Sequence, residues 1–227
     1  MEIEAKFTVL DLQTFKQLAE VNELAGLRLG KARVKLAHDC YLDTAQRAFL
    51  LAGYACRLRT VGEARIVTLK SFATATGALH QRREFEVQLT PATPRSAGQF
   101  VDLWPGSEAT SLARELSDGQ PLGLLFELQQ ERHVRLATQR GSNSPVAEVS
   151  LDLVRFGDGV TFQAYELEVE LLPGGRVADL GPMIAELIER WAVLPEPTSK
   201  FERGLALCCP ELISALAQRK THARSPE

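Results

Sequence analysis

The sequence is poor in the side chains on which most nucleophilic and thiolate sites depend. Its 227 residues include four cysteines, four histidines, two tryptophans and two methionines. The cysteines, Cys40, Cys56, Cys208 and Cys209, lack the spacing of a zinc motif, and two adjacent cysteines do not readily bridge to each other. We therefore expect reduced, structural thiols in a cytoplasmic protein. The scattered histidines, His38, His80, His133 and His222, are expected to be surface or structural residues.

Several other signals are missing as well. The chain has no GxxxxGK[ST] phosphate loop, no GxGxxG before a helix and no GxSxG nucleophile elbow. No apolar run approaches membrane-spanning length, and Met1 leads straight into a periodic segment, so we expect neither a membrane partner nor a secretory signal. The net charge of −3 argues against a generally basic nucleic-acid binder. Any chemistry must therefore rest on carboxylates, bases and metal.

The hydrophobic pattern predicts one strand-rich domain. Strands are expected over residues 1–7, 31–41, 54–61, 64–72, 79–89, 126–137, 146–156 and 160–172. Turns are expected at Gly62 and Glu63 and at residues 157–159. An even number of mostly antiparallel strands with short connections suits a closed barrel, because closure removes exposed edges. We therefore expect an α+β fold dominated by β structure, an eight-stranded antiparallel β-barrel with flanking helices.

Helices are expected at four places between and after these strands. One should follow Asp11 and end before Gly26, and a short one should follow Asp43 or Thr44 and end at Gly53. Residues 99–116 suggest two short helices around a Pro-Gly pair. A last helix follows Gly175 and should cover the sheet with Leu180, Ile184, Leu187, Ile188 and Trp191. Trp104 is likewise expected in the core.

Charged residues recur on one face of the predicted strands. In MEIEAKF, the alternation places Glu2, Glu4 and Lys6 on one side and Ile3, Ala5 and Phe7 on the other. Strand parity adds Arg57, Arg59, Thr68, Lys70, Arg82, Glu84, Glu86, Arg132, Glu148, Asp152, Glu166, Glu168 and Glu170.

This charged face has two interpretations. It either meets solvent, which is the simpler reading of any single strand, or lines a wide, wet interior. Enclosed charges are costly unless they are paired or bound to ions, so a charged interior predicts a highly charged ligand together with a metal. Arginine and lysine suit phosphate, and carboxylates suit a hard cation such as Mg²⁺ or Mn²⁺.

The ordered motifs resemble the CYTH superfamily, the triphosphate tunnel metalloenzymes. EIEAKF is similar to the family's ExExK signature, and further blocks follow in the family's order. These blocks are YLDT, ACRLRT, IVTLK, RREFEV, SLDLVRF, YELEVEL and SKFERGLAL. The resemblance covers residues 1–207, which we expect to form the tunnel domain, with 208–227 as a C-terminal extension. It implies an eight-stranded barrel whose tunnel is lined by charged side chains.

The resemblance also implies roles for individual residues. Glu2, Glu4, Lys6 and Asp152 would be catalytic. The metal ligands would be Glu2, Glu4, Glu168 and Glu170, with Glu166 as a further member, and Asp152 and one of Glu84 and Glu86 would serve a second metal or position water. The phosphate-binding bases would be Lys6, Arg57, Arg59, Lys70, Arg82, Arg132, Lys200 and Arg203. The family often has another arginine just upstream of Arg132, where Gln129 and Gln130 stand here. Whether Arg132 or Arg135 faces the tunnel therefore stays open.

By this resemblance we expect a hydrolase that cleaves inorganic triphosphate with Mg²⁺ or Mn²⁺. Thiamine triphosphatase, adenylate cyclase and a non-catalytic polyphosphate- or nucleotide-binding module are the alternatives. SKFERGLAL resembles the form of the domain that is often fused to a helical CHAD domain, which favours a polyphosphate-related role. The sequence decides neither the oligomeric state, for which a homodimer is open, nor the physiological triphosphate.

Overall fold

The computed structural model describes residues 1–72, 74–90, 93–94, 98–157 and 162–213, and in this part of the chain thirteen strands belong to one antiparallel sheet. The strands are β1 (Glu2–Val9), β2 (Glu23–Leu24), β3 (Leu27–Leu29), β4 (Arg33–Asp43), β5 (Tyr54–Val61), β6 (Ala64–Ser71), β7 (Thr74–Thr76), β8 (Leu79–Arg82), β9 (Glu84–Leu89), β10 (Gly123–Thr138), β11 (Pro145–Phe156), β12 (Phe162–Leu171) and β13 (Val193–Pro195). The helices are α1 (Leu12–Glu20), α2 (Ala48–Leu51), α3 (Glu108–Ser117), α4 (Val177–Arg190) and α5 (Lys200–Cys208), with 3-10 turns η2 (Val101–Leu103) and η3 (Pro210–Leu212).

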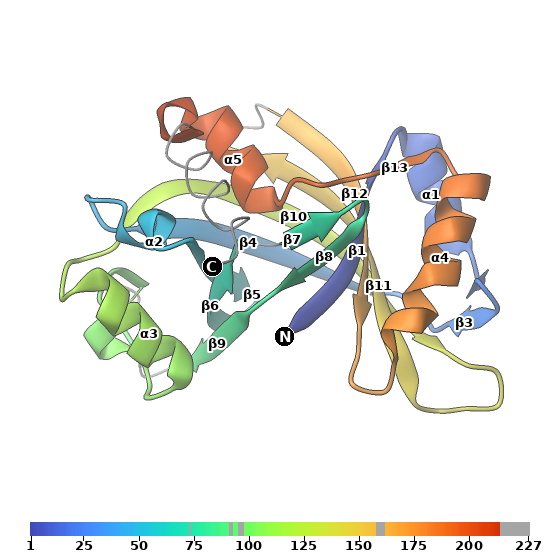
Figure 1. The fold of residues 1–227 in the computed structure, drawn as a ribbon, viewed down its shortest axis with the longest axis horizontal. Helices are drawn as coiled ribbons and strands as arrows, with labels where there is room; N and C mark the ends of the chain where they lie inside the picture. The colour runs from blue at the N-terminus through green and yellow to red at the C-terminus, as the bar shows by residue number, and fades with distance from the viewer. Residues whose placement is uncertain (73, 91–92, 95–97, 158–161, 214–227) are drawn as a thin grey trace, which may run out of the picture.

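The sheet curls until its two ends meet (Figure 1). The strand order is β7-β8-β1-β12-β11-β10-β4-β5-β6-β9, where the short strand β7 pairs with β8, and Arg83 alone separates β8 from β9. Because β8 pairs with β1 while β9 pairs with β6, the segment that contains both strands connects the two ends. Counted as one segment, it makes eight strand positions around the ring. The predicted fold class, a strand-dominated antiparallel barrel with flanking helices, is confirmed.

The prediction of one unbroken strand over residues 79–89 is wrong. The chain changes pairing partner at Arg83, whose backbone N–H donates to Ser71 Oγ and whose carbonyl accepts from the Ser71 N–H, both at 3.0 Å. Alternation of apolar and polar residues continues through such a break, so the sequence pattern does not reveal it. Arg82, Glu84 and Glu86 nevertheless all line the interior.

Smaller differences concern boundaries and short strands. The second predicted strand begins and ends two residues later, as β4, and the pattern did not indicate β2, β3, β7 or β13. Asp11 caps α1 as predicted, accepting a 2.7 Å hydrogen bond from the Thr14 N–H. In the predicted loop at residues 157–159, only Gly157 is described, and its φ of +81° is one that glycine adopts without strain. The rest of that loop lies outside the described residues. The predicted domain boundary at residue 207 falls within α5 and stays a prediction.

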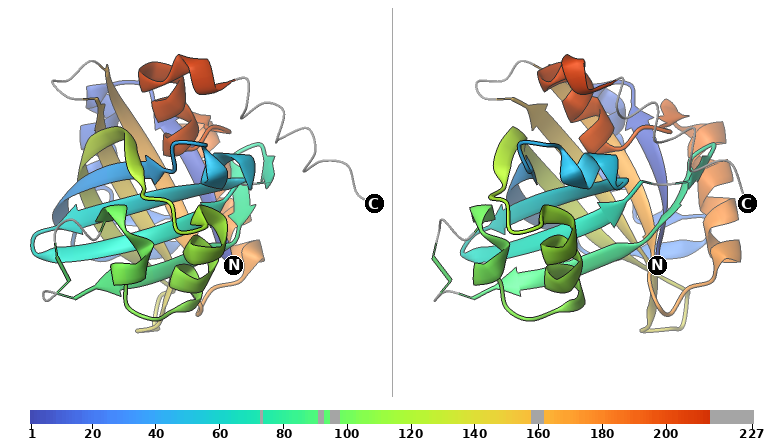
Figure 2. Two further views of the ribbon diagram at one scale, coloured as in Figure 1. Left: turned by 90° about the vertical axis from the view of Figure 1, so that its left-hand side faces the viewer. Right: turned by 60° about the vertical axis from the view of Figure 1, so that its left-hand side comes forward.

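The helices cover the outer faces and one end of the curled sheet. Figure 1 places α1 and α4 together on one flank and α3 on the opposite flank, and Figure 2 shows α3 against the β6–β9 side. Phe7 and Leu167 pack against Leu180, Met183 and Leu187 in the cluster under α4. Ile188, predicted to join that core, is instead 47% exposed. The buried face of α4 consists of Leu180, Met183 and Leu187, and Ile188 lies outside it. Trp104 is buried as predicted, and Trp191 packs at the edge of the cluster under α4.

Helix α5 lies over one end of the barrel and closes it with aromatic side chains. Phe201 packs against Tyr41 and Phe126, with ring centroids 5.4 and 6.1 Å apart. Gly204 permits this approach, because a Cβ at that position would overlap the Phe126 ring. The helix therefore fixes the position of its first residue, Lys200, which lines the interior. No helix in the described part of the chain is long and apolar enough to cross a membrane.

Candidate functional site

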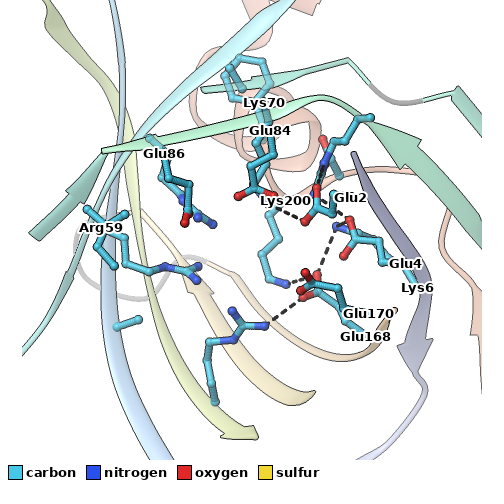
Figure 3. A pocket seen from close by; sticks show the side chains of 18 of the residues that line it. Glu2, Glu4, Lys6, Arg59, Lys70, Glu84, Glu86, Glu168, Glu170 and Lys200 are labelled. Carbon is cyan, nitrogen blue, oxygen red and sulfur yellow. Dashed lines mark hydrogen bonds and ion pairs between the residues drawn. The ribbon is translucent and has the colours of Figure 1, made fainter. Parts of the chain in front are cut away.

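The curled sheet encloses a cavity of about 540 Å³ (Figure 3). The charged face of the strands points into it, so the second interpretation of the sequence pattern, a charged interior, is the correct one. The charged lining residues are Glu2, Glu4, Lys6, Lys35, Arg57, Arg59, Lys70, Arg82, Glu84, Glu86, Arg132, Glu148, Glu168, Glu170, Lys200 and Glu202. Eight of these are acidic and eight are basic.

The two signs of charge are segregated around the ring. The adjacent strands β10, β4, β5 and β6 contribute five bases and no acid to the lining, and we call this set the basic wall: Lys35, Arg57, Arg59, Lys70 and Arg132. The remaining strands contribute seven acids and two bases, and we call this set the acidic wall: Glu2, Glu4, Lys6, Arg82, Glu84, Glu86, Glu148, Glu168 and Glu170. Figure 3 shows Arg59 across the cavity from Glu2, Glu4 and Glu170. Such a cavity offers bases to an anion on one side and carboxylates to a cation on the other.

Register between neighbouring strands builds the acidic wall. Glu4 lies opposite Glu170 and Lys6 opposite Glu168 in the β1–β12 pair, and Glu2 lies opposite Arg82 in the β1–β8 pair. Lys6 Nζ is 3.2 Å from both a Glu4 and a Glu168 oxygen, and Arg82 Nη2 donates to Glu4 at 2.7 Å. The two bases on this wall thus neutralise part of its negative charge.

The pKa values within the acidic wall diverge. Burial alone would raise the pKa of Glu2, but Lys70 and Arg82 outweigh it and hold that pKa well below its usual value. Lys200, Lys6 and Arg132 similarly outweigh burial at Glu168. At Glu170, burial and the charge of Glu2 raise the pKa to about 7. Burial also raises the pKa of Glu84. The wall therefore carries more carboxylate than its own bases neutralise.

The basic wall is anchored by a carboxylate that the sequence analysis missed. Asp39 on β4 is fully buried and accepts from Arg59 Nε and Nη2, each at 2.7 Å, and from Gln130 Nε2 at 2.6 Å. Arg57 Nη1 lies 3.8 Å from the same carboxylate. Burial raises the pKa of Asp39, but Arg57 and Arg59 outweigh it and keep the carboxyl ionised. Alternation along β4 places Asp39 on the same face as Lys35 and Tyr41, and this pattern could have indicated that Asp39 points inward.

Arg57 retains a free hydrogen-bonding group. Its Nη2 donates to Thr68 Oγ1 at 3.2 Å, and Thr68 in turn donates to Glu86 at 3.0 Å. Its Nε is buried without a hydrogen-bond partner among the described residues. Buried polar groups are rarely left unpaired, so an orphaned guanidinium N–H beside a cavity indicates an anionic ligand.

Lys200, the first residue of α5, contributes a further base to the cavity lining. A capping box between Ser199 and Glu202 starts the helix, and Lys200 Nζ lies 2.7 Å from Glu168, 2.8 Å from Glu166 and 3.1 Å from Asp152. Its side chain is 7% exposed, so Lys200 is not a solvent-exposed lysine at the helix terminus.

Three predicted site residues lie behind the lining rather than in it. Asp152 is fully buried and binds Arg132 Nε at 2.9 Å as well as Lys200. Glu166 pairs with Lys200 and with Arg203, which also contacts Glu196. None of Asp152, Glu166 and Arg203 lines the cavity, and their assigned roles stay predictions.

The remaining predicted residues line the cavity. Arg132 faces it, whereas Arg135 turns outward and donates to the carbonyls of Gly30 and Leu29, which decides the alternative left open by the sequence. The full set that the structure brings together is Glu2, Glu4, Lys6, Arg57, Arg59, Lys70, Arg82, Glu84, Glu86, Arg132, Glu168, Glu170 and Lys200.

The acidic wall fits a hard divalent cation by its chemistry. Its donors are carboxylate oxygens, and the raised pKa of Glu170 reflects negative charge that a cation would relieve. Among the described residues, no three of these carboxylates bring oxygens within 4.8 Å of one another. Several are held by Lys6, Lys70 and Arg82 instead. A cation held by these carboxylates would therefore have to displace the bases that now pair with them.

Comparison with known proteins identifies the architecture. A family model described as the CYTH domain matches residues 1–193. Among solved structures, HpAC1 from Hippeastrum superposes with a TM-score of 0.70 at 21% identity, covering 91% of this chain and 96% of that one. A protein of Bacillus halodurans described as an adenylate cyclase candidate (TM-score 0.59, 21% identity, 89% and 96% coverage) and PH1819 of Pyrococcus horikoshii (0.56, 16%, 91% and 99%) share the fold. No curated protein matches the chain significantly.

Proposed function

Because the chain belongs to the CYTH domain family, we propose that it is a metal-dependent triphosphatase that hydrolyses inorganic triphosphate to pyrophosphate and phosphate in this cavity. The observation that carries the proposal is the division of the cavity lining into a basic wall of five bases and an acidic wall of seven acids and two bases. A polyanion alone would draw Lys6 and Arg82 away from the glutamates, and a cation alone would leave Arg57 Nε without a partner. A triphosphate with a divalent cation matches both walls. The structure of HpAC1 is described as revealing a dominant triphosphatase activity, which is consistent with this proposal.

The basic wall binds the phosphate chain. Arg57 offers its unpaired Nε, and Asp39 and Gln130 hold Arg59 in a fixed orientation, so little side-chain entropy is lost when an anion binds. Lys70 and Arg132 lie on either side of these arginines in the ring. Asp152, which we predicted to be catalytic, orients Arg132 and Lys200 from behind the lining.

The acidic wall would hold the cation and orient the attacking water. Glu2, Glu4, Glu84, Glu168 and Glu170 would supply the oxygens, with Glu86 as a further carboxylate of the lining. Mg²⁺ or Mn²⁺ would neutralise phosphoryl charge and lower the pKa of a water bound to it. Lys6 and Arg82 move from their glutamates to the phosphate, since both lie on this wall and can donate to either. Phosphoryl transfer needs little covalent participation by the protein, so positioning and charge neutralisation supply most of the rate.

An organic triphosphate is a second candidate substrate, favoured by one observation. The cavity lining also includes five apolar residues on β4, β5, β6 and β10, namely Ala37, Val61, Ala64, Ile66 and Val134. Such a surface suits a base or thiamine ring better than a phosphate. Adenylate cyclase and thiamine triphosphatase activities therefore belong in the same test.

The test incubates the protein with inorganic triphosphate, ATP and thiamine triphosphate, each with Mg²⁺, Mn²⁺ or chelator, and follows products by phosphorus NMR. We expect pyrophosphate and phosphate from inorganic triphosphate only when metal is present. Cyclic AMP or preferential cleavage of thiamine triphosphate would instead identify the organic candidate. Binding of triphosphate without any product would support a non-catalytic module and overturn the proposal.

A further inference from the structure

A cluster of three different ligating side chains lies on the outer face of the barrel. His38 and Cys40 are two residues apart on β4 and therefore share a face, while Asp39 between them points inward. Glu127 on β10 is the direct register partner of Cys40. All three side chains are half-buried. From the sequence, His38 was expected to be a surface or structural residue and Cys40 a structural thiol, because only the pairing of β4 with β10 brings Glu127 to them.

The three groups converge at the scale of a metal site. One potential ligand atom of each, an imidazole nitrogen, the thiol sulfur and a carboxylate oxygen, all lie within 4.8 Å of one another. His38 Nε2 and Glu127 Oε2 are already 3.0 Å apart. Ligand atoms around a tetrahedral zinc ion, with bonds of about 2.0 to 2.3 Å, are separated by roughly 3.5 Å. Small side-chain rotations therefore suffice, and paired strands hold the three Cα atoms in place.

The chemistry of this set differs from that of the cavity. The acidic wall offers oxygen only, whereas the outer cluster offers nitrogen, sulfur and oxygen, a combination that selects zinc or a similar transition metal over Mg²⁺. Among the described residues, this is the one group of three or more such side chains whose ligand atoms converge in this way. A cation bound here would also offset the negative charge that Glu127 places beside the thiol.

We propose that His38, Cys40 and Glu127 form a surface binding site for zinc or a similar divalent transition-metal ion, separate from the cavity and completed by water as a fourth ligand. His38 supplies a neutral imidazole nitrogen, Cys40 a thiolate after release of its proton to solvent, and Glu127 a carboxylate oxygen. The 42% exposure of His38 leaves a route for the ion and for that water.

The position of the site suggests what the ion would affect. It would tie β4 to β10 directly behind Asp39 and Gln130, which hold Arg59 on the inner face of the same two strands. Bound metal should therefore raise the melting temperature of the protein, because it binds the folded state in preference to the unfolded chain.

Cobalt spectroscopy on the full chain, stripped with chelator, tests the proposal. Co²⁺ bound to a thiolate gives a sulfur-to-cobalt charge-transfer band that an all-oxygen site cannot produce. Co²⁺ bound to the carboxylates of the cavity therefore does not contribute to this band. We expect the band at one equivalent of Co²⁺ and its loss on addition of one equivalent of Zn²⁺. Cys40→Ser should abolish it, and His38→Ala and Glu127→Gln should each weaken Co²⁺ binding about 10- to 100-fold.

Matched controls exist in the chain. Glu131 on the same strand binds His133 at 2.8 Å in a pair like that of Glu127 and His38, but the pair does not belong to a converging group with a thiol among the described residues. Glu131→Gln and Cys208→Ser should therefore leave the band unchanged. Glu4→Gln, which alters the cavity, should also leave it unchanged, so failure of the triphosphatase proposal and failure of this one are distinguishable. Absence of the band in the unmodified chain, or its persistence in Cys40→Ser, would overturn the site.

Discussion

The basic and acidic walls of the cavity differ in how their charges are held. On the basic wall, Arg59 is fixed by a buried carboxylate and a buried amide that take no part in the lining. On the acidic wall, glutamates pair with lysines and an arginine of the same lining, and Glu170 is left with a raised pKa. The basic wall is therefore preorganised to bind an anion. On the acidic wall, the lysines and the arginine neutralise glutamates that a divalent cation could neutralise in their place.

Removal of the anchor should have the largest effect on stability. Asp39→Asn keeps the shape of the side chain but leaves Arg59 buried without its counter-charge, so we expect the free energy of unfolding to fall by about 3 kcal/mol. The KM for triphosphate should rise because Arg59 loses its fixed orientation. Urea denaturation and steady-state kinetics measure the two effects.

Asp102→Asn is the matched control for this prediction. Asp102 accepts from Arg114 Nε at 2.8 Å, but both side chains are more than half exposed. Exposed pairs contribute about 1 kcal/mol or less, so stability and KM should barely change. Equal losses in the two variants would show that Asp39 does not anchor the basic wall.

Loss of one oxygen ligand should have the largest effect on catalysis. Glu4→Gln removes a charge from the centre of the acidic wall, and we expect metal-dependent phosphate release to fall on the order of 100-fold, mainly in kcat. Circular dichroism should show an unchanged fold. Glu63→Gln in the exposed β5–β6 turn is the control and should retain full activity. Unchanged turnover in Glu4→Gln would remove Glu4 from the metal site.

The different states of the two walls also predict a pH dependence. Burial and the charge of Glu2 raise the pKa of Glu170 in the folded state to about 7, above its usual value of 4.5. The group therefore contributes stability that is fully present below pH 4.5 and is lost as the pH rises through about 7. In chelator, we expect the unmodified protein to lose on the order of 2 kcal/mol relative to Glu170→Gln over this range.

Divalent cation should reverse this trend, because a cation near Glu170 favours its ionised form. Denaturation curves of both proteins at pH 5 and pH 8, with chelator or with Mg²⁺, measure the effect. If the free energy of unfolding in chelator changes by the same amount between pH 5 and pH 8 in both proteins, ionisation of Glu170 does not destabilise the folded state. The negative charge of the acidic wall would then already be balanced.

The sequence predicted the inward face of the barrel better than the supports behind it. Alternation in EIEAKF and YELEVEL identified Glu2, Glu4, Lys6, Glu168 and Glu170, because strand periodicity alone places such residues on one face. Which face is inward came from the family resemblance. Asp39 was missed because its partners lie on β5 and β10, 20 and 91 residues away in the chain, and no local pattern records such contacts. The change of pairing partner at Arg83 was missed for the same reason.

The smallest effect is expected for Lys6, a base that lies on the acidic wall and is proposed to bind the phosphate of the substrate. Lys6 Nζ lies 3.2 Å from Glu4 and from Glu168, so its ammonium ion neutralises carboxylates when the cavity holds no ligand. Lys6→Ala should raise the KM for triphosphate about tenfold, since one charged hydrogen bond to phosphate is lost. The affinity for Mg²⁺ without triphosphate should increase, because Lys6 no longer competes for the glutamates. Calorimetric titration with Mg²⁺ separates the two roles: weaker Mg²⁺ binding in Lys6→Ala would mean that Lys6 organises the carboxylates rather than competing with the cation.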